Sequence, residues 1–359
     1  MALPVPVKTL LPGSAQSLLT SAMLIEQFDA QTDDDRLAAC HQINVSGHAE
    51  DDPNVPEVTW RRFQAWWRYG FASEPVETWL ATDDDQHPVG CYLLWLPERE
   101  NRQNAIIALN VAQGRRRQGI GTALAAHAAG QAEQAGRTLL MSDTRVGAPG
   151  TAFAQACGAR AGIQELRRVL QVDADLLARL GGLRAGAEQH AAGYSLRSWS
   201  GLTPDSLLEQ ASALHNAMED APHDDSFEPL RWDAERLRTE EEHDIEAGLR
   251  INSVAALAND SGEMAALTQV YVDPDQADWG YQGLTAVTRP HRGHRLGMLV
   301  KTVMLQRLGE LEPRISAVET GNAASNQFMI AVNEQLGFRV TDTFQNWEID
   351  VAAARKLTE

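Results

Sequence analysis

Cysteine is scarce in this 359-residue sequence, which has three cysteines, Cys40, Cys91 and Cys157. They are far apart and none has C-x-x-C spacing, so neither a disulfide framework nor a cysteine zinc site is indicated. No run of eighteen apolar residues occurs, so no bilayer-spanning helix is expected. Residues 1–12 lack the charged start and apolar run of a signal peptide. We therefore expect a cytoplasmic protein.

Positive charge is also in short supply. The sequence has 49 Asp and Glu residues against 31 Lys and Arg residues, a formal net charge of −18 at pH 7. Such a protein repels phosphate backbones and anionic lipid, so nucleic acid and membranes are poor candidates as partners. Hydrophobic residues make up 43% of the chain, enough for packed cores in more than one domain. A homodimer is expected only because dimers are common among soluble proteins.

The boundary between two expected domains is predicted at residues 176–193, where glycines and small residues interrupt the strand and helix patterns. Residues 1–175 and 194–359 then present the same order of strands and helices, although few residues are identical. The chain is therefore expected to consist of two similar domains joined by a linker.

Two landmarks support this repeat. Arg116 and Arg292 are 176 positions apart, and Gly158 and Gly337 are 179 positions apart. Because both pairs share nearly the same offset, the sequence predicts a duplicated α+β domain of about 170 to 180 residues per copy.

The first candidate site is the loop that joins the strand ending at Val111 to an alanine-rich helix. The first backbone N–H groups of a helix lack partners within it, and the helix dipole adds partial positive charge, so this end attracts phosphate. Three consecutive arginines make the loop basic, although a solvated basic turn is the alternative. The expected cofactor-binding residues are Val111, Arg116, Arg117, Gln118, Gly119, Ile120, Gly121 and Thr122.

A second loop, VTRPHRGHRLG, follows another strand in the same way. Arg295 stands where the first loop has Gly119, and its side chain either narrows the approach of a phosphate or binds the phosphate itself. Neither loop has the lysine of a G-x-x-x-x-G-K-[ST] nucleotide loop. The expected cofactor-binding residues are Val287, Arg292, Gly293, His294, Arg295, Leu296 and Gly297.

The first loop and two later segments resemble those of a known family. The pattern V-x-x-x-x-R-x-x-G-I-G in the first loop is similar to the acyl-CoA pyrophosphate loop of the GNAT superfamily of N-acetyltransferases. The segments AFAQACGAR and NAASNQFMIAVNEQLGF resemble its second CoA-facing helix, and they lie in the two halves. The chain therefore resembles a tandem GNAT protein, of the kind to which mycothiol synthase belongs. The resemblance implies two domains, each a mixed, mostly antiparallel sheet with splayed central parallel strands and flanking helices.

The resemblance also implies an activity. Acetyl-CoA would be the co-substrate, the acetyl group would pass directly to the amine of a small molecule, and no metal would be required. A backbone N–H near Val111 or Val287 would meet the thioester oxygen, which stabilises an oxyanion. One half would do the chemistry, with a slight preference for the C-terminal half, and CoA could bind in both. The alternative is a non-catalytic acyl-CoA-binding or scaffolding protein.

The sequence departs from the family at one catalytic position. Family members often carry a tyrosine four residues before the glycine of the L-G-F turn, where its hydroxyl can protonate the thiolate. This chain has Ala154 and Asn333 there, and neither side chain can act as that acid. Release of the thiolate would use water, another side chain or no acid.

Candidates for the remaining chemistry lie at strand ends and at a helix start. Glu319, Asp143 and Tyr281 are the catalytic candidates, because each is expected near the splayed strands, with a solvated or hydrogen-bonded residue as the alternative that such positions more often favour. Asn322 and Asn326 are added to the cofactor-binding set, with helix capping as the alternative.

Two clusters are candidates for recognising the acceptor. An acidic loop would favour a cationic amine, whereas tryptophans in a helix usually pack a core and an acidic loop is usually solvated. The clusters are Trp60, Trp66, Trp67 and Tyr69 in the first half, and Asp220, His223, Asp224 and Asp225 in the second.

Overall fold

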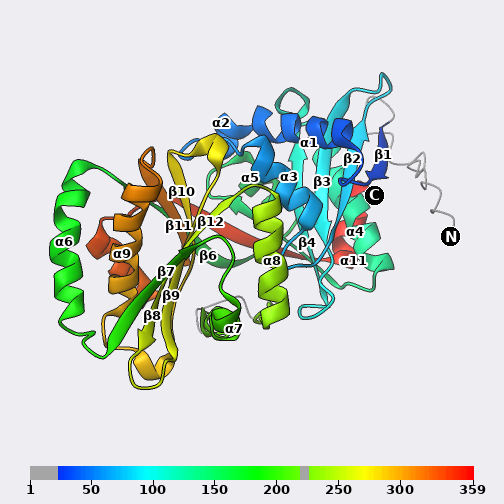
Figure 1. Ribbon diagram of the computed structural model, residues 1–359. Helices are drawn as coiled ribbons and strands as arrows, with labels where there is room; N and C mark the ends of the chain where they lie inside the picture. The colour runs from blue at the N-terminus through cyan, green and yellow to red at the C-terminus, as the bar shows by residue number, and fades with distance from the viewer. Residues whose placement is uncertain (1–22, 219–225) are drawn as a thin grey trace. The chain divides into compact units, whose positions relative to one another are not determined.

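The computed structural model describes residues 23–218 and 226–359, and its chain forms two compact units (Figure 1). The first, here called the N-terminal unit, consists of residues up to 162 together with residues 344–359. The second, the C-terminal unit, consists of residues 163–343. Each unit is an α+β domain built on one sheet, as the sequence predicted.

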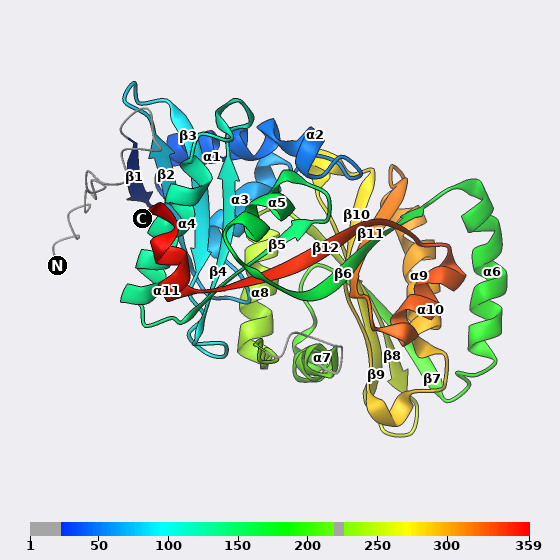
Figure 2. The same ribbon diagram turned by 180° about the vertical axis from the view of Figure 1, so that it is seen from behind.

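The N-terminal unit has the strand order β1-β2-β3-β4-β5-β12, in which only β4 and β5 are parallel. Helices α1 and α3 contact one face of the sheet and α4 contacts the other (Figure 2). Its elements are β1 (Leu24–Phe28), α1 (Asp34–Ser46), α2 (His48–Asp51), α3 (Trp60–Tyr69), β2 (Val76–Thr82), β3 (Pro88–Trp95), β4 (Asn104–Val111), α4 (Ile120–Gln134), β5 (Leu139–Arg145), α5 (Pro149–Ala156), β12 (Arg339–Asp350) and α11 (Val351–Ala354).

The C-terminal unit has the strand order β6-β11-β10-β9-β8-β7, and its parallel pair is β10 and β11. Helices α7 and α8 contact one face of this sheet, whereas α9 packs on the other face together with α6 and α10. Its elements are β6 (Arg160–Gln171), α6 (Ala174–Glu188), β7 (Tyr194–Ser200), α7 (Asp205–Met218), α8 (Ala234–Glu246), β8 (Arg250–Ala258), β9 (Met264–Val272), β10 (Trp279–Val287), α9 (Leu296–Leu311), β11 (Ala317–Ala323) and α10 (Gln327–Leu336).

The last strand of each sheet comes from the opposite half of the chain. In the N-terminal unit residues 344–350 of β12 pair antiparallel with β5, and in the C-terminal unit β6 pairs antiparallel with β11. The sequence predicted two contiguous copies, residues 1–175 and 194–359. In the structure the two compact units instead exchange one strand.

Most of the predicted linker at residues 176–193 is helical, because α6 extends to Glu188. Leu176 and Leu180 are one helical turn apart, and both are buried in the core under α9. The side chain of Asp173 caps the helix by accepting a hydrogen bond from the Leu176 N–H at 2.8 Å. Tertiary packing of the leucines therefore outweighs the low helix propensity of the glycines within it.

In both units the parallel strands separate soon after they begin to pair. Strands β4 and β5 are in register only over Asn104–Ile106 and Leu139–Met141, and β10 and β11 only over Trp279–Tyr281 and Ala317–Glu319. Beyond the third pair, each strand of the two continues without the other. This confirms the splayed central strands expected from the sequence.

Candidate functional site

The two predicted loops have the same backbone conformation. After Val111, residues Gln113–Arg115 form a 3-10 turn, Arg116 is extended, and α4 begins at Ile120. Gly119 precedes the helix in a left-handed conformation, with φ of 82°. The guanidinium Nε of Arg116 donates to the carbonyl of Val111 at 3.3 Å and folds the loop back over its strand.

The second loop repeats each of these features. It has a 3-10 turn at Arg289–His291, followed by extended Arg292, whose Nε donates to the carbonyl of Val287 at 3.1 Å. Arg295 occupies the left-handed position before α9, with φ of 54°.

Glycine and arginine are exchanged between the left-handed positions of the two loops. The first loop has Arg117 at φ of 65° and then Gly119, whereas the second has Gly293 at φ of 89° and then Arg295. A left-handed non-glycine residue costs about 1 to 2 kcal/mol, and each loop contains one. Arg295 therefore does not distort the second loop, and the helix start behind it keeps the same geometry.

The first turn of the helix differs in how much room it leaves. A Cβ added to Gly121 would lie 3.3 Å from the ring of Phe153 and 3.6 Å from Val111. A Cβ added to Gly297 would have Val287 as its nearest neighbour, at 3.8 Å. A side chain at Gly297 thus has more room than one at Gly121, although Gly297 is buried and Gly121 is half-buried.

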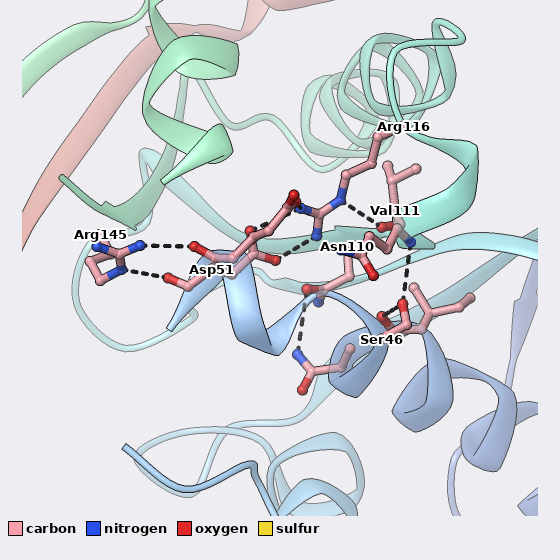
Figure 3. A network of polar contacts seen from close by, with 10 residues as sticks. Ser46, Asp51, Asn110, Val111, Arg116 and Arg145 are labelled. Atoms are coloured by element: carbon pink, nitrogen blue, oxygen red, sulfur yellow. Dashed lines mark hydrogen bonds and ion pairs between the residues drawn. The ribbon is translucent and has the colours of Figure 1, made fainter. Parts of the chain in front are cut away.

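The arginine of the first loop is held by acidic residues (Figure 3). Arg116 forms ion pairs with Asp51 at 2.5 Å and Glu50 at 3.0 Å, both on α2. Arg145, at the end of β5, donates to the backbone carbonyls of the same two residues at 2.7 and 2.8 Å. Two carboxylates therefore already occupy the Arg116 guanidinium, which the sequence predicts to bind a phosphate.

The second loop follows a strand with a β-bulge. The register of β10 against β9 shifts between Gln282 and Thr285, so Gly283 and Leu284 lie opposite Gln269 alone. A bulge leaves one residue outside the ladder and exposes its backbone groups. In the N-terminal unit β3 and β4 pair without a shift from Gly90↔Val111 to Trp95↔Ile106.

Glycine suits the close packing at the bulge. A Cβ on Gly283 would lie 2.5 Å from the ring of Tyr271, which is half-buried. Burial, reinforced by the carboxylates of Asp244, Glu241 and Glu240, raises the pKa of Tyr271 well above its usual value. The amide of Gln282 satisfies bulge carbonyls by donating to Gln269 at 2.6 Å.

Two of the three catalytic candidates meet at the bulged strand. Tyr281 and Glu319 are register partners in the last pair before β10 and β11 separate, and both are half-buried. The indole N–H of Trp279 donates to Oε2 of Glu319 at 3.1 Å, and the Tyr281 hydroxyl donates to Gln276 at 2.5 Å. Asp143 belongs to the N-terminal unit and is exposed.

The corresponding pair in the N-terminal unit is apolar. Its last pair before the strands separate is Ile106 and Met141. Neither side chain can accept or donate a proton, so only the C-terminal unit places ionisable groups at this position.

The two asparagines expected to hold a cofactor have different surroundings. Asn326 caps α10 by accepting a hydrogen bond from the Met329 N–H at 3.3 Å, which is its capping alternative. Asn322, near the end of β11, accepts from the side chain of Asn333 at 2.8 Å.

Sequence reasoning missed Lys301, which donates to Asn333 at 2.9 Å. Burial lowers the pKa of this lysine to about 7. Its signal in the sequence is a single charge inside the apolar helix MLVKTVML.

The predicted acceptor clusters have different outcomes. Phe63 and Trp67 are buried and stack with ring centres 4.9 Å apart, while Trp66 is exposed, so the aromatic helix mainly packs a core. The acidic residues 220–225 lie outside the described residues. Within residues 23–218 and 226–359, no group of three or more His, Cys, Asp or Glu is arranged to hold a metal ion, and no helix is long and apolar enough to cross a membrane.

Comparison with known proteins identifies relatives in fold and sequence. Residues 37–159 match the acetyltransferase (GNAT) family. No curated protein gave a match. The chain is similar to the solved structure of a tandem GNAT protein from the clavulanic acid biosynthesis pathway, with 29% identity and a TM-score of 0.77, covering 92% of this chain and 98% of that one.

Two more distant structures share the fold. A GCN5-related N-acetyltransferase from Sphaerobacter thermophilus has 15% identity and a TM-score of 0.63, covering 95% of this chain and 97% of that one. Saccharomyces cerevisiae N-myristoyltransferase has 12% identity and a TM-score of 0.60, covering 98% and 86%. The chain thus has the fold of a tandem GNAT protein, and its residues 37–159 match the GNAT acetyltransferase family.

Proposed function

We propose that this protein is an acetyl-CoA-dependent N-acetyltransferase that transfers an acetyl group directly to the amine of a small molecule, and that its C-terminal unit does so. The observation that carries the proposal is the last pair of the parallel strands. It is Tyr281 and Glu319 in the C-terminal unit but Ile106 and Met141 in the N-terminal unit. The bulge in β10 supports the same choice.

The residues of the C-terminal unit fit acetyl-CoA, which supplies an activated acetyl thioester when bound. The first backbone N–H groups of α9 have no partner within the helix and suit a pyrophosphate, and Arg292 adds positive charge in the loop before it. The separating strands leave backbone groups that can pair with an amide-bearing arm. A backbone N–H of the bulged strand, toward Val287, would be the donor for an oxyanion.

The proton chemistry falls to Glu319. An ammonium substrate must lose a proton before it can attack a carbonyl, and a half-buried carboxylate at the strand separation can accept it directly or through water. Trp279 holds one carboxylate oxygen of Glu319 and leaves the other for this task. We place Tyr281 beside it as an orienting residue. The net charge of −18 would favour a cationic amine.

A location and an assembly complete the proposal. We propose a cytoplasmic protein, which the three unpaired cysteines support. A homodimer is proposed only from its frequency among soluble proteins.

The test is a turnover assay on the full chain with acetyl-CoA and a panel of small amines, in which release of the free thiol is followed. Calorimetric titration of acetyl-CoA alone counts the binding sites. We expect one strong site and thiol release that depends on an amine. Binding without thiol release for any amine would contradict the enzymatic role.

The second candidate is a non-catalytic acyl-CoA-binding or scaffolding protein. The absence of a hydroxyl acid at Ala154 and Asn333 favours this role, as do the ion pairs that Glu50 and Asp51 form with Arg116. Binding of acetyl-CoA with no thiol release distinguishes it from the enzyme.

A further inference from the structure

A lysine side chain is buried in the core of the C-terminal unit. Lys301 lies in the middle of α9 and is 2% exposed. Its Nζ donates to Oδ1 of Asn333 on α10 at 2.9 Å and lies 4.9 Å from the ring centre of Phe338. Burying an amine is unfavourable, so its place among leucines and valines calls for a reason other than packing.

The lysine sets the direction of the hydrogen bonds that follow. Lys301 donates to Oδ1 of Asn333, so the Nδ2 group of Asn333 faces the other side. That Nδ2 group donates to Oδ1 of Asn322 at 2.8 Å. Because Oδ1 of Asn322 is occupied, its Nδ2 group is the outer end of this series of hydrogen bonds. The outer end is therefore a hydrogen-bond donor and not an acceptor.

Asn322 lies beyond the point where the parallel strands separate. The last pair joins Tyr281 and Glu319, and Asn322 is farther along β11. Side chains alternate along a strand, so Asn322 shares a face with Val318, which is in the core under α9. Glu319 points to the opposite face. The donor and the proposed proton acceptor thus approach the same separation from two sides of the sheet.

A second cation is buried on the face that Asn322 shares. Arg168 on β6 is the register partner of Thr320, and directly paired residues of antiparallel strands point the same way. Arg168 is 2% exposed, and its Nε and Nη1 atoms have no hydrogen-bond partner among the described residues. Its charged neighbour is Glu334 on α10. This face is therefore rich in donors and suits a ligand with acceptor atoms.

The N-terminal unit lacks the whole chain of hydrogen bonds. Counted from the helix starts, Lys301 corresponds to Ala125, and counted from the glycines that end the second helices, Asn333 corresponds to Ala154. Counted from the strand pairs, Asn322 corresponds to Thr144, whose hydroxyl accepts from the indole of Trp347 at 2.8 Å.

We propose that Lys301, acting through Asn333, is a positioning residue that fixes the side-chain amide of Asn322 as a hydrogen-bond donor to acyl-CoA bound between β10 and β11. The inference rests on the proposed function, because it needs acyl-CoA in the C-terminal unit. It explains why both members of the Lys301 and Asn333 pair are replaced by alanine in the unit that lacks ionisable groups at the last strand pair.

The test measures the affinity of the full chain for acetyl-CoA by calorimetry. Lys301→Met keeps the volume and removes the donor, and we expect affinity to fall about three- to tenfold, the effect of one lost hydrogen bond. Lys301→Arg keeps a donor-only group and should recover part of the loss. Thr302→Val removes a neighbouring buried hydroxyl that bonds only to its own helix, and should leave affinity unchanged.

A double-mutant cycle separates positioning from packing. If Lys301 acts through Asn322, the Lys301→Met/Asn322→Ala protein binds acetyl-CoA as Asn322→Ala alone does. Asn322→Asp still accepts from Asn333 but turns the outward donor into an acceptor, so it should weaken binding at least as much as Lys301→Met. This variant decides the question if Lys301→Met does not fold.

Three results would overturn the inference. Wild-type affinity in Lys301→Met or Asn322→Asp would show that no outward donor is used, and additive losses in the cycle would show that Lys301 acts independently of Asn322. In both cases acetyl-CoA still binds and the proposed function stands. A wild-type protein that does not bind acetyl-CoA overturns both.

Discussion

In the N-terminal unit the parallel strands separate after Ile106 and Met141, whereas in the C-terminal unit they separate after Tyr281 and Glu319. The loops that follow have one backbone conformation in both units. The backbone of the loop therefore does not distinguish the two units. The side chains at the strand separation do, because Tyr281 and Glu319 can exchange a proton and Ile106 and Met141 cannot.

The comparison also shows that the second loop does not need a glycine at position 295. Arg295 takes the left-handed conformation of Gly119, and Arg117 takes that of Gly293. What the loop needs is a residue with positive φ at two positions, and glycine at one of them is enough here.

The largest expected effect tests the proton acceptor. Glu319→Gln keeps the shape and the hydrogen bond from Trp279, but removes the group that takes the proton, so we expect kcat to fall about 10²- to 10⁴-fold. The assay is thiol release at saturating acetyl-CoA. The matched change at the same strand position of the N-terminal unit, Met141→Gln, should leave kcat within about twofold if that unit is silent.

Gly297→Glu should abolish acetyl-CoA binding at the second loop. A carboxylate at the first turn of α9 would face the pyrophosphate, and like-charge contacts of this kind cost several kcal/mol, or about 100-fold in affinity. Calorimetry checks it, with Gly297→Ala as the control because a Cβ there meets nothing closer than 3.8 Å. Gly121→Glu should have little effect on the strong site. Loss of the strong site in this variant would show that it lies in the N-terminal unit.

A buried histidine makes the N-terminal unit sensitive to acid. Burial lowers the pKa of His127 to about 4, and its Nδ1 lies 2.7 Å from the hydroxyl of Tyr92. The unfolded chain binds this proton near pH 6.5, so stability is fully present above that pH and is lost as the pH falls toward 4. The loss should reach about 2 to 3 kcal/mol.

The measurement is the free energy of unfolding from pH 7 to 4, for the wild type and His127→Gln. We expect the difference between the two to narrow as the pH falls, since glutamine does not titrate. A constant difference over this range would show that His127 is not the source. His215 of the C-terminal unit, whose pKa burial also lowers to about 4, titrates in both proteins and cancels.

The smallest expected effect concerns the ion pairs of Arg116 in the first loop. Replacing Glu50 and Asp51 together by Gln and Asn should strengthen acetyl-CoA binding to the N-terminal unit about three- to tenfold, because Arg116 is released and the opposing charge is removed. The Gly297→Glu background leaves only this site to be measured. Unchanged acetyl-CoA affinity in this variant would mean that the two carboxylates are not the reason why the two loops differ in affinity.

The sequence predicted the strand, loop and helix around both candidate sites, because glycine, arginine and apolar patterns are local signals. It also named Tyr281 and Glu319 separately, but their pairing depends on the register of β10 and β11, which no local pattern sets. The bulge was missed because Gly283 is one glycine among many until the ring of Tyr271 is placed beside it.

Long-range features were beyond local patterns in the same way. The helical state of residues 176–188 depends on a core that Leu176 and Leu180 enter. The ion pair between Arg116 and Asp51 joins positions far apart in the sequence. Lys301 was visible as a charge in an apolar helix, but its partner Asn333 could be found only in space.

The exchanged strands impose an order on biosynthesis. The ribosome delivers β1 to β5 first, yet the strand that closes their sheet, β12, follows every strand of the C-terminal unit along the chain. We therefore expect the N-terminal sheet to be completed only once β12 has been made, whereas β6, which closes the C-terminal sheet, precedes the other strands of its unit. The half of the molecule made first is the half completed last.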